Sequence, residues 1–176
     1  MGRTKALVDV GGIPMAARVA SALRGAGCSP VIACGGDVDE LAVLGLMVVT
    51  DRFPGEGPLG GIIEALLFCS TSEDPGDTDV LIAPCDLPFL ESTDLAAMVA
   101  AARTHPGADV LVAATTQREP GCALWRTSAL AQIEARFDAG ERAIHRMLDH
   151  LAVVEVSFAA RALRNINTLD DLGRYS

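Results

Sequence analysis

The chain has 176 residues, of which half are hydrophobic and only 4% are aromatic. This length is typical of one domain with its own core, and the composition excludes a largely disordered chain. The 23 acidic residues outnumber the 14 basic ones and give a net charge of −9 at pH 7, which excludes nucleic acid and anionic membranes as expected partners. A phosphorylated small molecule would have to be bound locally, by a few cations, backbone amides or a metal ion.

The cysteines and the apolar runs indicate the cellular compartment of the protein. Five cysteines are scattered along the chain without a Cys-x-x-Cys pair, so neither a disulfide framework nor a zinc site is expected. The apolar runs are too short to span a membrane, and the N-terminus carries no apolar signal segment. We therefore expect a cytoplasmic protein whose residues 1–176 form a single domain.

Short apolar runs alternate with segments of helical periodicity, which is typical of an α/β protein with a parallel sheet covered by helices. Several apolar runs do not alternate with polar residues, which indicates strands buried on both faces. In the first half of the chain we expect a helix behind Pro14 that ends near Gly25, strands at 30–34 and 46–50, a helix at 58–67 and a strand at 80–84. A helix with Ser92 as N-cap that ends near His105 and a strand at 109–114 follow. Two helices are expected within 128–151, interrupted near 138–140, then a strand at 153–158 and a short helix with a capping box at Thr168 and Asp171.

Three candidate site segments follow expected strands. In open parallel sheets, ligands bind beyond the carboxyl ends of the strands, which makes Cys34, Asp51 and Asp86 candidates. Asp86 stands between two prolines in a stiff turn, where its carboxylate could hold Mg²⁺ together with phosphate oxygens. The alternative is an aspartate that only caps this turn before the next helix.

Other segments have both a functional and a structural interpretation. Asp51 begins a Gly- and Pro-rich loop that contains Gly57 and leads into the start of a helix, where free N–H groups could bind an anion. The alternative is that the loop simply connects a strand to a helix. Lys5 precedes an apolar segment and is typical of a solvated charge. Asn165 and Asn167 are either turn formers or ligand-binding amides.

Together, these segments resemble, in order and spacing, those of the molybdenum cofactor guanylyltransferases, a family of nucleotidyltransferases. The resemblance extends over essentially the whole chain. The segments that carry it are Met1-Gly2-Arg3-Thr4-Lys5-Ala6-Leu7, Gly12-Ile13-Pro14-Met15, Asp51 with Gly57-Pro58-Leu59-Gly60-Gly61-Ile62, Pro84-Cys85-Asp86-Leu87-Pro88-Phe89, Glu119-Pro120-Gly121-Cys122-Ala123-Leu124-Trp125-Arg126 and Asn165-Ile166-Asn167-Thr168.

The resemblance implies transfer of GMP from GTP to the terminal phosphate of molybdopterin, with release of pyrophosphate. It implies catalytic roles for Lys5, which would neutralise triphosphate charge, and for Asp86, which would hold Mg²⁺. The nucleotide-binding residues would be Lys5, Cys34, Asp51, Gly57 and Asp86, with Cys34 standing where the family uses an amide side chain. The substrate-binding residues would be Arg126, Arg142, Arg146, Asn165 and Asn167, although a solvated helix face is the commoner explanation for Arg142 and Arg146.

The family's fold is a three-layer α/β/α Rossmann-like sandwich of the nucleotide-diphospho-sugar transferase type, with a mostly parallel sheet. Family members begin with a strand and a Gly-rich loop that wraps the triphosphate, and this sequence carries neither, so we expect a fold that lacks the first strand and expect such residues to be encoded upstream of Met1. The resemblance also implies other molybdenum-cofactor biosynthesis proteins and molybdoenzyme apoproteins as partners. The alternatives are transfer of CMP to molybdopterin or to another phosphorylated acceptor, and a noncatalytic protein that binds nucleotide or pterin.

Overall fold

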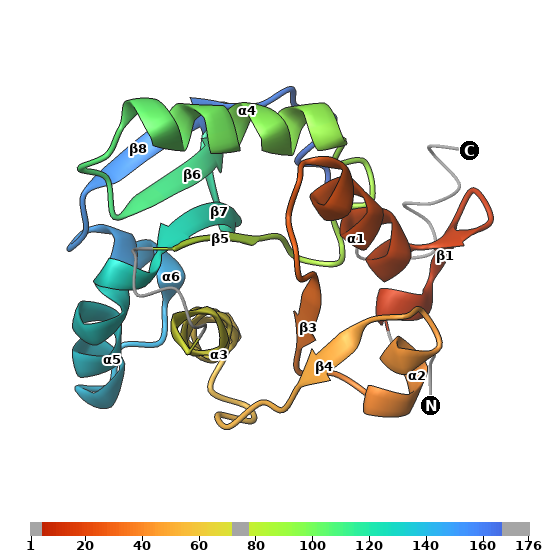
Figure 1. Cartoon of the computed structure of the whole chain (residues 1–176), viewed down its shortest axis with the longest axis horizontal. Helices are drawn as coiled ribbons and strands as arrows, with labels where there is room; N and C mark the ends of the chain where they lie inside the picture. Colours follow the sequence, from red (N-terminus) through yellow and green to blue (C-terminus); the bar gives the residue numbers. More distant parts are fainter. Residues whose placement is uncertain (1–4, 72–77, 167–176) are drawn as a thin grey trace.

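The computed structural model describes residues 5–71 and 78–166, and its strands form three separate groups. A short hairpin of β1 (Asp9–Val10) and β2 (Ile13–Pro14) follows a 3₁₀ turn, η1 (Lys5–Leu7). β3 (Ile32–Cys34) pairs in parallel with β4 (Met47–Val49), and α2 (Val38–Ala42) connects them. Figure 1 shows this pair apart from the larger sheet.

The larger sheet has four strands in the order β5, β7, β6, β8. The strands are β5 (Asp79–Ile82), β6 (Val110–Ala114), β7 (Arg118–Arg126) and β8 (Val153–Ser157). β6 and β8 are parallel, whereas β7 runs antiparallel to both of its neighbours, so the sheet is mixed. The predicted α/β class is therefore confirmed, but the expectation of a mostly parallel sheet is wrong, because β7 pairs antiparallel with two strands. The sequence pattern predicted neither β7 nor the short strands β1 and β2.

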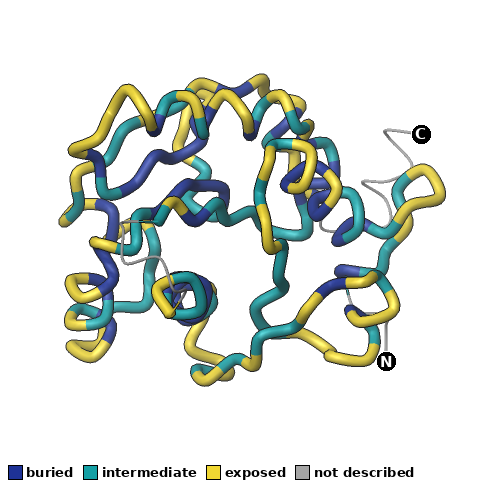
Figure 2. The backbone as a smooth tube through the Cα atoms, viewed as in Figure 1, coloured by how far each residue is buried: buried dark blue, intermediate teal, exposed yellow. Residues whose placement is uncertain are grey.

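Helices cover both faces of the larger sheet (Figure 1). On one face lie α3 (Pro58–Ser70), α5 (Leu130–Asp138) and α6 (Ile144–Leu148), and on the other α1 (Met15–Gly25) and α4 (Ser92–Thr104). Side chains of β6 alternate between the two cores: Val110 and Val112 pack with α3 and α5, whereas Leu111 packs with α1 and α4. All five residues of β6 are buried (Figure 2), as the unbroken apolar run predicted.

Most predicted elements appear within a residue or two of their expected bounds. One correction concerns α4, in which Ser92 is the first helical residue and Glu91 is the N-cap. Glu91 occupies the N-cap position because it forms a capping box with Asp94, in which the backbone N–H of each residue donates to the carboxylate of the other. The helix predicted after Thr168 lies outside the described residues. No helix in the described ranges is long and apolar enough to cross a membrane.

Candidate active site

Loops at the carboxyl ends of β3 and β4 meet at one edge of the fold. Gly35 and Gly36 follow β3 with φ values of +72° and +91°, a left-handed conformation that glycine adopts without strain. Asp51 follows β4 and lies against this turn, since a Cβ added at Gly35 would stand 3.6 Å from the Asp51 Cβ. Asp51 and the segment after Cys34, both nominated as strand-end candidates, therefore lie next to each other.

The loop that begins at Asp51 is fixed to the helical layer by local contacts. Asp51 Oδ1 accepts a hydrogen bond from the Phe53 N–H at 2.8 Å, which closes a turn. Arg52 Nε donates to Glu64 Oε1 on α3 at 2.6 Å, and the Phe53 ring packs edge-on against Phe137 with centroids 4.8 Å apart. These contacts hold the backbone between Asp51 and the start of α3 in one position.

Gly57 is the N-cap of α3 and has a φ of +85°. Because glycine has no side chain, no side-chain oxygen caps the first-turn amides, and Pro58 occupies the first turn, where its missing N–H costs nothing. The first-turn N–H groups of a 13-residue helix carry a partial positive charge that favours an anion. This end of α3 is therefore suited to a phosphate group.

Lys5 and Asp86 form an ion pair across 81 residues of sequence. Lys5 Nζ lies 2.5 Å from Asp86 Oδ2, and the two side chains are 39% and 19% exposed. Asp86 sits in a turn that is closed by a backbone bond from the Leu87 N–H to the Pro84 carbonyl, and the partner of its carboxylate is Lys5. The carboxylate is open enough to exchange its partner.

The C-terminal segment is attached to the same turn. The Ile166 N–H donates to the Asp86 carbonyl at 3.0 Å, which places the exposed Asn165 next to the Asp86 loop. Asn165 is thus brought to the candidate site, and Asn167 lies outside the described residues. The predicted role of Asn165 stays a prediction.

The cysteines near the site are not activated as nucleophiles. Burial, followed by the charges of Glu64 and neighbouring groups, raises the pKa of the Cys34 thiol to about 11. Burial and the adjacent Asp86 carboxylate raise the pKa of Cys85, an effect that the nearby Lys5 ammonium partly offsets. Both thiols are therefore protonated at neutral pH, and Cys34 offers a weak hydrogen-bond donor where the resemblance implied contact with a nucleotide.

The structure brings four of the five predicted nucleotide-binding residues to one cavity. Lys5, Cys34, Asp51 and Gly57 line a cavity of about 890 Å³, and Asp86 borders it through its contact with Lys5. Three of these residues, Cys34, Asp51 and Asp86, lie at or after strand ends, where the strand-end rule placed candidate site residues. The site is therefore a mouth of this cavity, formed by the segments after β3, β4 and β5.

The predicted arginines have other partners. Arg142 lies beside Gly57, but its Nε donates to Glu56 and its guanidinium lies 3.8 Å from the Phe137 ring centroid. Arg142 precedes α6 rather than lying on it, so it does not share a helix face with Arg146. Arg146 donates to both carboxylate oxygens of Glu141 at 2.8 and 3.0 Å and is 59% exposed.

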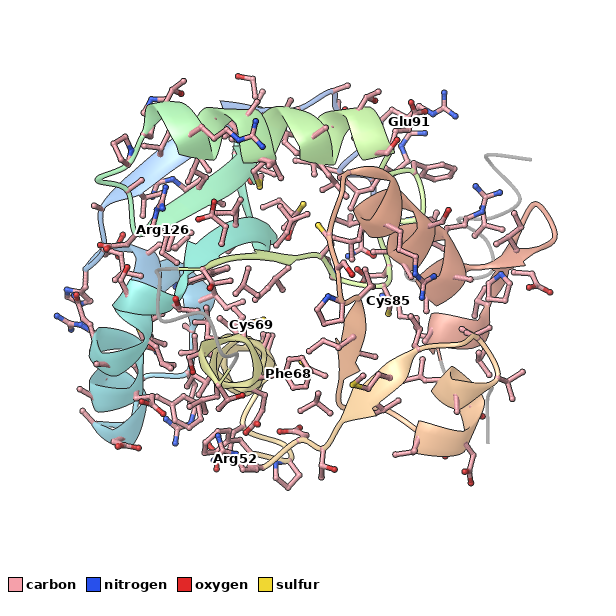
Figure 3. The ribbon with its side chains drawn as sticks, in the orientation of Figure 1. Arg52, Phe68, Cys69, Cys85, Glu91 and Arg126 are labelled. Carbon is pink, nitrogen blue, oxygen red and sulfur yellow. The ribbon has the colours of Figure 1, made fainter. Side chains whose placement is uncertain are left out.

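Arg126 is not brought to the site. It pairs in register with Asp79 at the start of β5, whereas Asp86 follows the end of that strand. Its guanidinium forms an ion pair with Asp79 at 3.3 Å and donates to the carbonyls of Ala108 and Ala102. Figure 3 shows Arg126 and Cys85 at opposite ends of the strand layer. Arg126 therefore ties the sheet to α4 at the far end from the candidate site.

Sequence reasoning did not single out the acids that hold these cations. Glu56 lies in the loop before α3 and Glu64 lies on α3, yet only the fold shows that they pair with Arg142 and Arg52. Glu141 lies five residues before Arg146 and outside α6, a spacing that the i,i+4 rule for helical pairs does not identify. Its pairing with Arg146 lowers the pKa of the Glu141 carboxyl to about 2.

The layered fold and the glycine-containing strand-end loops define an α/β nucleotidyltransferase. The model of the MobA-like NTP transferase domain matches residues 1–155, and the chain belongs to this family. It is 34% identical to the molybdenum cofactor guanylyltransferase of Rhodobacter capsulatus over 180 residues, which cover 99% of this chain and 87% of that protein. It is also 34% identical to the molybdenum cofactor guanylyltransferase of Cupriavidus necator, over 97% of this chain and 86% of that protein.

Solved structures share the fold. The crystal structure of molybdopterin-guanine dinucleotide biosynthesis protein A from Archaeoglobus fulgidus superposes with a TM-score of 0.74 at 24% identity and covers 98% of this chain and 89% of that chain. The 2-C-methyl-D-erythritol 4-phosphate cytidylyltransferase of Thermus thermophilus superposes with a TM-score of 0.71 at 17% identity, over 97% and 91% of the two chains. At these identities the likeness concerns the fold.

Proposed function

We propose that this protein is a molybdenum cofactor guanylyltransferase, which transfers GMP from GTP to the terminal phosphate of molybdopterin and releases pyrophosphate. Relatives at 34% identity over nearly the whole chain bear that name. The observation in the structure that carries the proposal is the Lys5–Asp86 pair, which places an exchangeable cation and an exchangeable carboxylate at the mouth of the cavity lined by Asp51 and Gly57.

The reaction needs no nucleophile from the protein. An oxygen of the acceptor phosphate forms a bond to the α-phosphorus of GTP, and the bond from that phosphorus to the bridging oxygen breaks, so that its electron pair leaves with pyrophosphate. The protonated Cys34 and Cys85 thiols agree with this scheme, because no covalent intermediate is required. The protein contributes position and charge.

The residues at the site would contribute both charge and position. The Lys5 ammonium would neutralise triphosphate oxygens once it leaves Asp86. The first-turn amides of α3, left uncapped by Gly57, would receive a phosphate group. Asp51, held by its turn with Phe53, would accept a hydrogen bond from the nucleotide. Asn165 would lie on the acceptor side, next to the Asp86 loop.

The Asp86 carboxylate is suited to be a Mg²⁺ ligand. Its carboxylate is 19% exposed and already neutralised by a cation, and no group of three or more potential metal ligands occurs among residues 5–71 and 78–166. Such a lone carboxylate is typical of a magnesium site completed by substrate phosphates and water. When bound there, Mg²⁺ would supply positive charge for the pyrophosphate that leaves.

The proposal is tested by measuring pyrophosphate release by the purified chain with molybdopterin, Mg²⁺ and either GTP or CTP. Release with GTP and not with CTP is expected, and the reverse preference would establish the cytidylyl alternative. D86N should lower turnover by about 10²-fold or more, whereas D39N removes an equal charge from exposed α2 and should leave turnover unchanged. Calorimetric binding of GTP without any turnover would instead support a noncatalytic nucleotide-binding protein.

A further inference from the structure

Glu119 is the second residue of β7 and lies at the same end of the sheet as the candidate site. β7 is antiparallel to β5, and its last residue, Arg126, pairs with Asp79 at the start of β5. The first residues of β7 therefore lie beside the end of β5, where the chain turns towards Asp86. Glu119 is partly buried there and has no role in the nucleotide site described above.

A bulge in β7 sets the position of Glu119. Val112 of β6 pairs with Ala123, but the next residue of β6, Ala113, pairs with Glu119. Residues 120–122 of β7 therefore lie between two successive pairs of the ladder. Such bulges bend a strand and redirect its side chains, and they are frequent next to active sites.

The bulge places the Glu119 carboxylate close to the turn that carries Asp86. A Cβ added at Gly121 would lie 3.3 Å from Glu119 Oε1 and 3.4 Å from Pro84 Cγ, so the space of one missing side chain separates the carboxylate from Pro84. Pro84 and Gly121 both line the cavity at the candidate site. Glu119 is therefore a second carboxylate next to the Asp86 turn.

The Glu119 carboxylate differs from that of Asp86 in its partners. Asp86 is paired with Lys5, whereas no ion pair within residues 5–71 and 78–166 includes Glu119. Its carboxylate accepts one hydrogen bond, from the Gly121 N–H at 3.4 Å, which is long for such a bond. Most of its capacity to accept hydrogen bonds is therefore left for a ligand. In a chain with a net charge of −9, this carboxylate repels phosphate and favours a neutral group that donates N–H bonds.

We propose that Glu119 binds the pterin ring of the acceptor through the ring N3–H and the 2-amino group. This inference rests on the proposed function, which makes molybdopterin the acceptor. The two donors are adjacent on the pyrimidinone ring and match the two oxygens of one carboxylate. The phosphate lies at the opposite end of the molecule, so this orientation keeps the phosphate away from the negative charge of Glu119.

Guanine carries the same donor pair in its N1–H and 2-amino groups, but the position of Glu119 favours the acceptor. The proposed nucleotide residues Cys34, Asp51 and Gly57 lie at the ends of β3 and β4 and at the start of α3, whereas Glu119 lies on β7 in the other sheet (Figure 1). In an in-line displacement, the acceptor oxygen enters opposite the departing pyrophosphate. The acceptor and the nucleotide therefore approach Asp86 from different sides.

The test measures binding of 6-hydroxymethylpterin to the full chain through quenching of the pterin fluorescence. The matched probe is 6-hydroxymethyllumazine, which carries an oxygen in place of the 2-amino group. We expect the chain to bind the pterin about tenfold more tightly than the lumazine or better, because the lumazine oxygen faces the carboxylate without donating a hydrogen bond. E119Q should weaken pterin binding about tenfold or more and should leave lumazine binding nearly unchanged, so that the preference disappears.

Two further variants separate recognition from a structural role. E134Q makes the same change on α5 and should leave both affinities unchanged. E119D keeps a carboxylate on a shorter stem and should prefer the pterin more than E119Q does. A purely structural role of Glu119 would weaken the binding of both probes equally, and that result would overturn the proposal.

A second pair of ligands tests guanine. GTP and ITP differ by the same 2-amino group, and their affinities are measured by calorimetry. E119Q should leave the ratio of these two affinities unchanged. A change in that ratio, with the pterin preference intact, would assign Glu119 to guanine and overturn the proposal, as would the absence of saturable pterin binding to the unaltered chain.

Failure of this inference and failure of the proposed function are separate results. Pyrophosphate release from GTP with molybdopterin, together with a pterin preference that persists in E119Q, would overturn the role of Glu119 and leave the function in place. Loss of the pterin preference in E119Q, without any turnover of molybdopterin by the unaltered chain, would support pterin binding by Glu119 and contradict the transferase.

Discussion

The Arg52–Glu64 pair offers a direct test of how the site loop is held. Arg52 follows Asp51, and Glu64 lies on α3, so the pair fastens the loop that begins at Asp51 to the helix. Replacing Arg52 by Met keeps most of the aliphatic stem and removes the charge. We expect R52M to lower the stability of the fold and to weaken nucleotide binding, because a buried carboxylate loses its partner and Asp51 loses its support.

The exposure of the two side chains sets the magnitude. Glu64 is 6% exposed and Arg52 is 57% exposed, with Nε and Oε1 2.6 Å apart. Fully exposed pairs contribute up to about 1 kcal/mol, and removing one partner of a fully buried pair costs about 3–5 kcal/mol. With one partner buried and the other in contact with water, we expect R52M to lower the free energy of unfolding by about 2 kcal/mol. For a chain of this length, that loss lowers Tm by about 4–8 °C.

The control is R118M, which removes an ion pair of similar geometry at the surface. Arg118 Nε lies 2.7 Å from Glu155, but the two side chains are 41% and 53% exposed, so the expected loss is about 0.5 kcal/mol. Tm of each variant is measured by calorimetry, and GTP affinity is measured by titration. Equal Tm losses in R52M and R118M would refute the argument that burial of Glu64 sets the cost, and unchanged GTP affinity in R52M would refute the positioning role.

Three further predictions concern individual residues. Because the pKa of the Cys34 thiol is raised to about 11, iodoacetamide at neutral pH should alkylate it about a hundredfold more slowly than a thiol of pKa 9.0, as measured by mass spectrometry. The stability linked to this thiol should be lost as the pH rises from 9 to 11. C34A should abolish that part of the loss in alkaline unfolding. R126M should lower Tm and leave GTP affinity unchanged. G57A should cost about 1 kcal/mol in urea unfolding and weaken GTP binding, whereas G107A, at an open position without a positive φ, should do neither.

Local patterns predicted most of the elements. The unbroken apolar run of β6 indicated burial on both faces, and its alternate side chains do enter two different cores. β7 was missed because its first residues, from Arg118 to Gly121, include a proline and a glycine, which are depleted in strands. Its pairing with β5 and β6 on both sides compensates for this unfavourable local sequence.

The positions of the strand-end candidates could be predicted from the sequence, but their contacts could not. The strand-end rule nominated Asp51 and Asp86, but only the fold shows that Lys5 reaches Asp86 over 81 residues. Arg126 belongs to a segment that carries the resemblance, but this membership did not predict its position. β7 runs antiparallel to β5, so Arg126, the last residue of β7, pairs with Asp79, the first residue of β5. Direction along the sheet, which no local pattern encodes, decides which end of a strand faces the site.

The ion pairs also explain how an acidic protein could bind a triphosphate. Arg142 and Arg146, which the resemblance suggested for phosphate binding, are already paired with Glu56 and Glu141. Lys5 differs because its partner, Asp86, is itself a proposed magnesium ligand. If Mg²⁺ takes the carboxylate as the triphosphate takes the ammonium, neither charge is left without a partner. Free GTP or Mg²⁺ alone would have to break the pair without this compensation, so the magnesium complex of GTP should bind more tightly than either component.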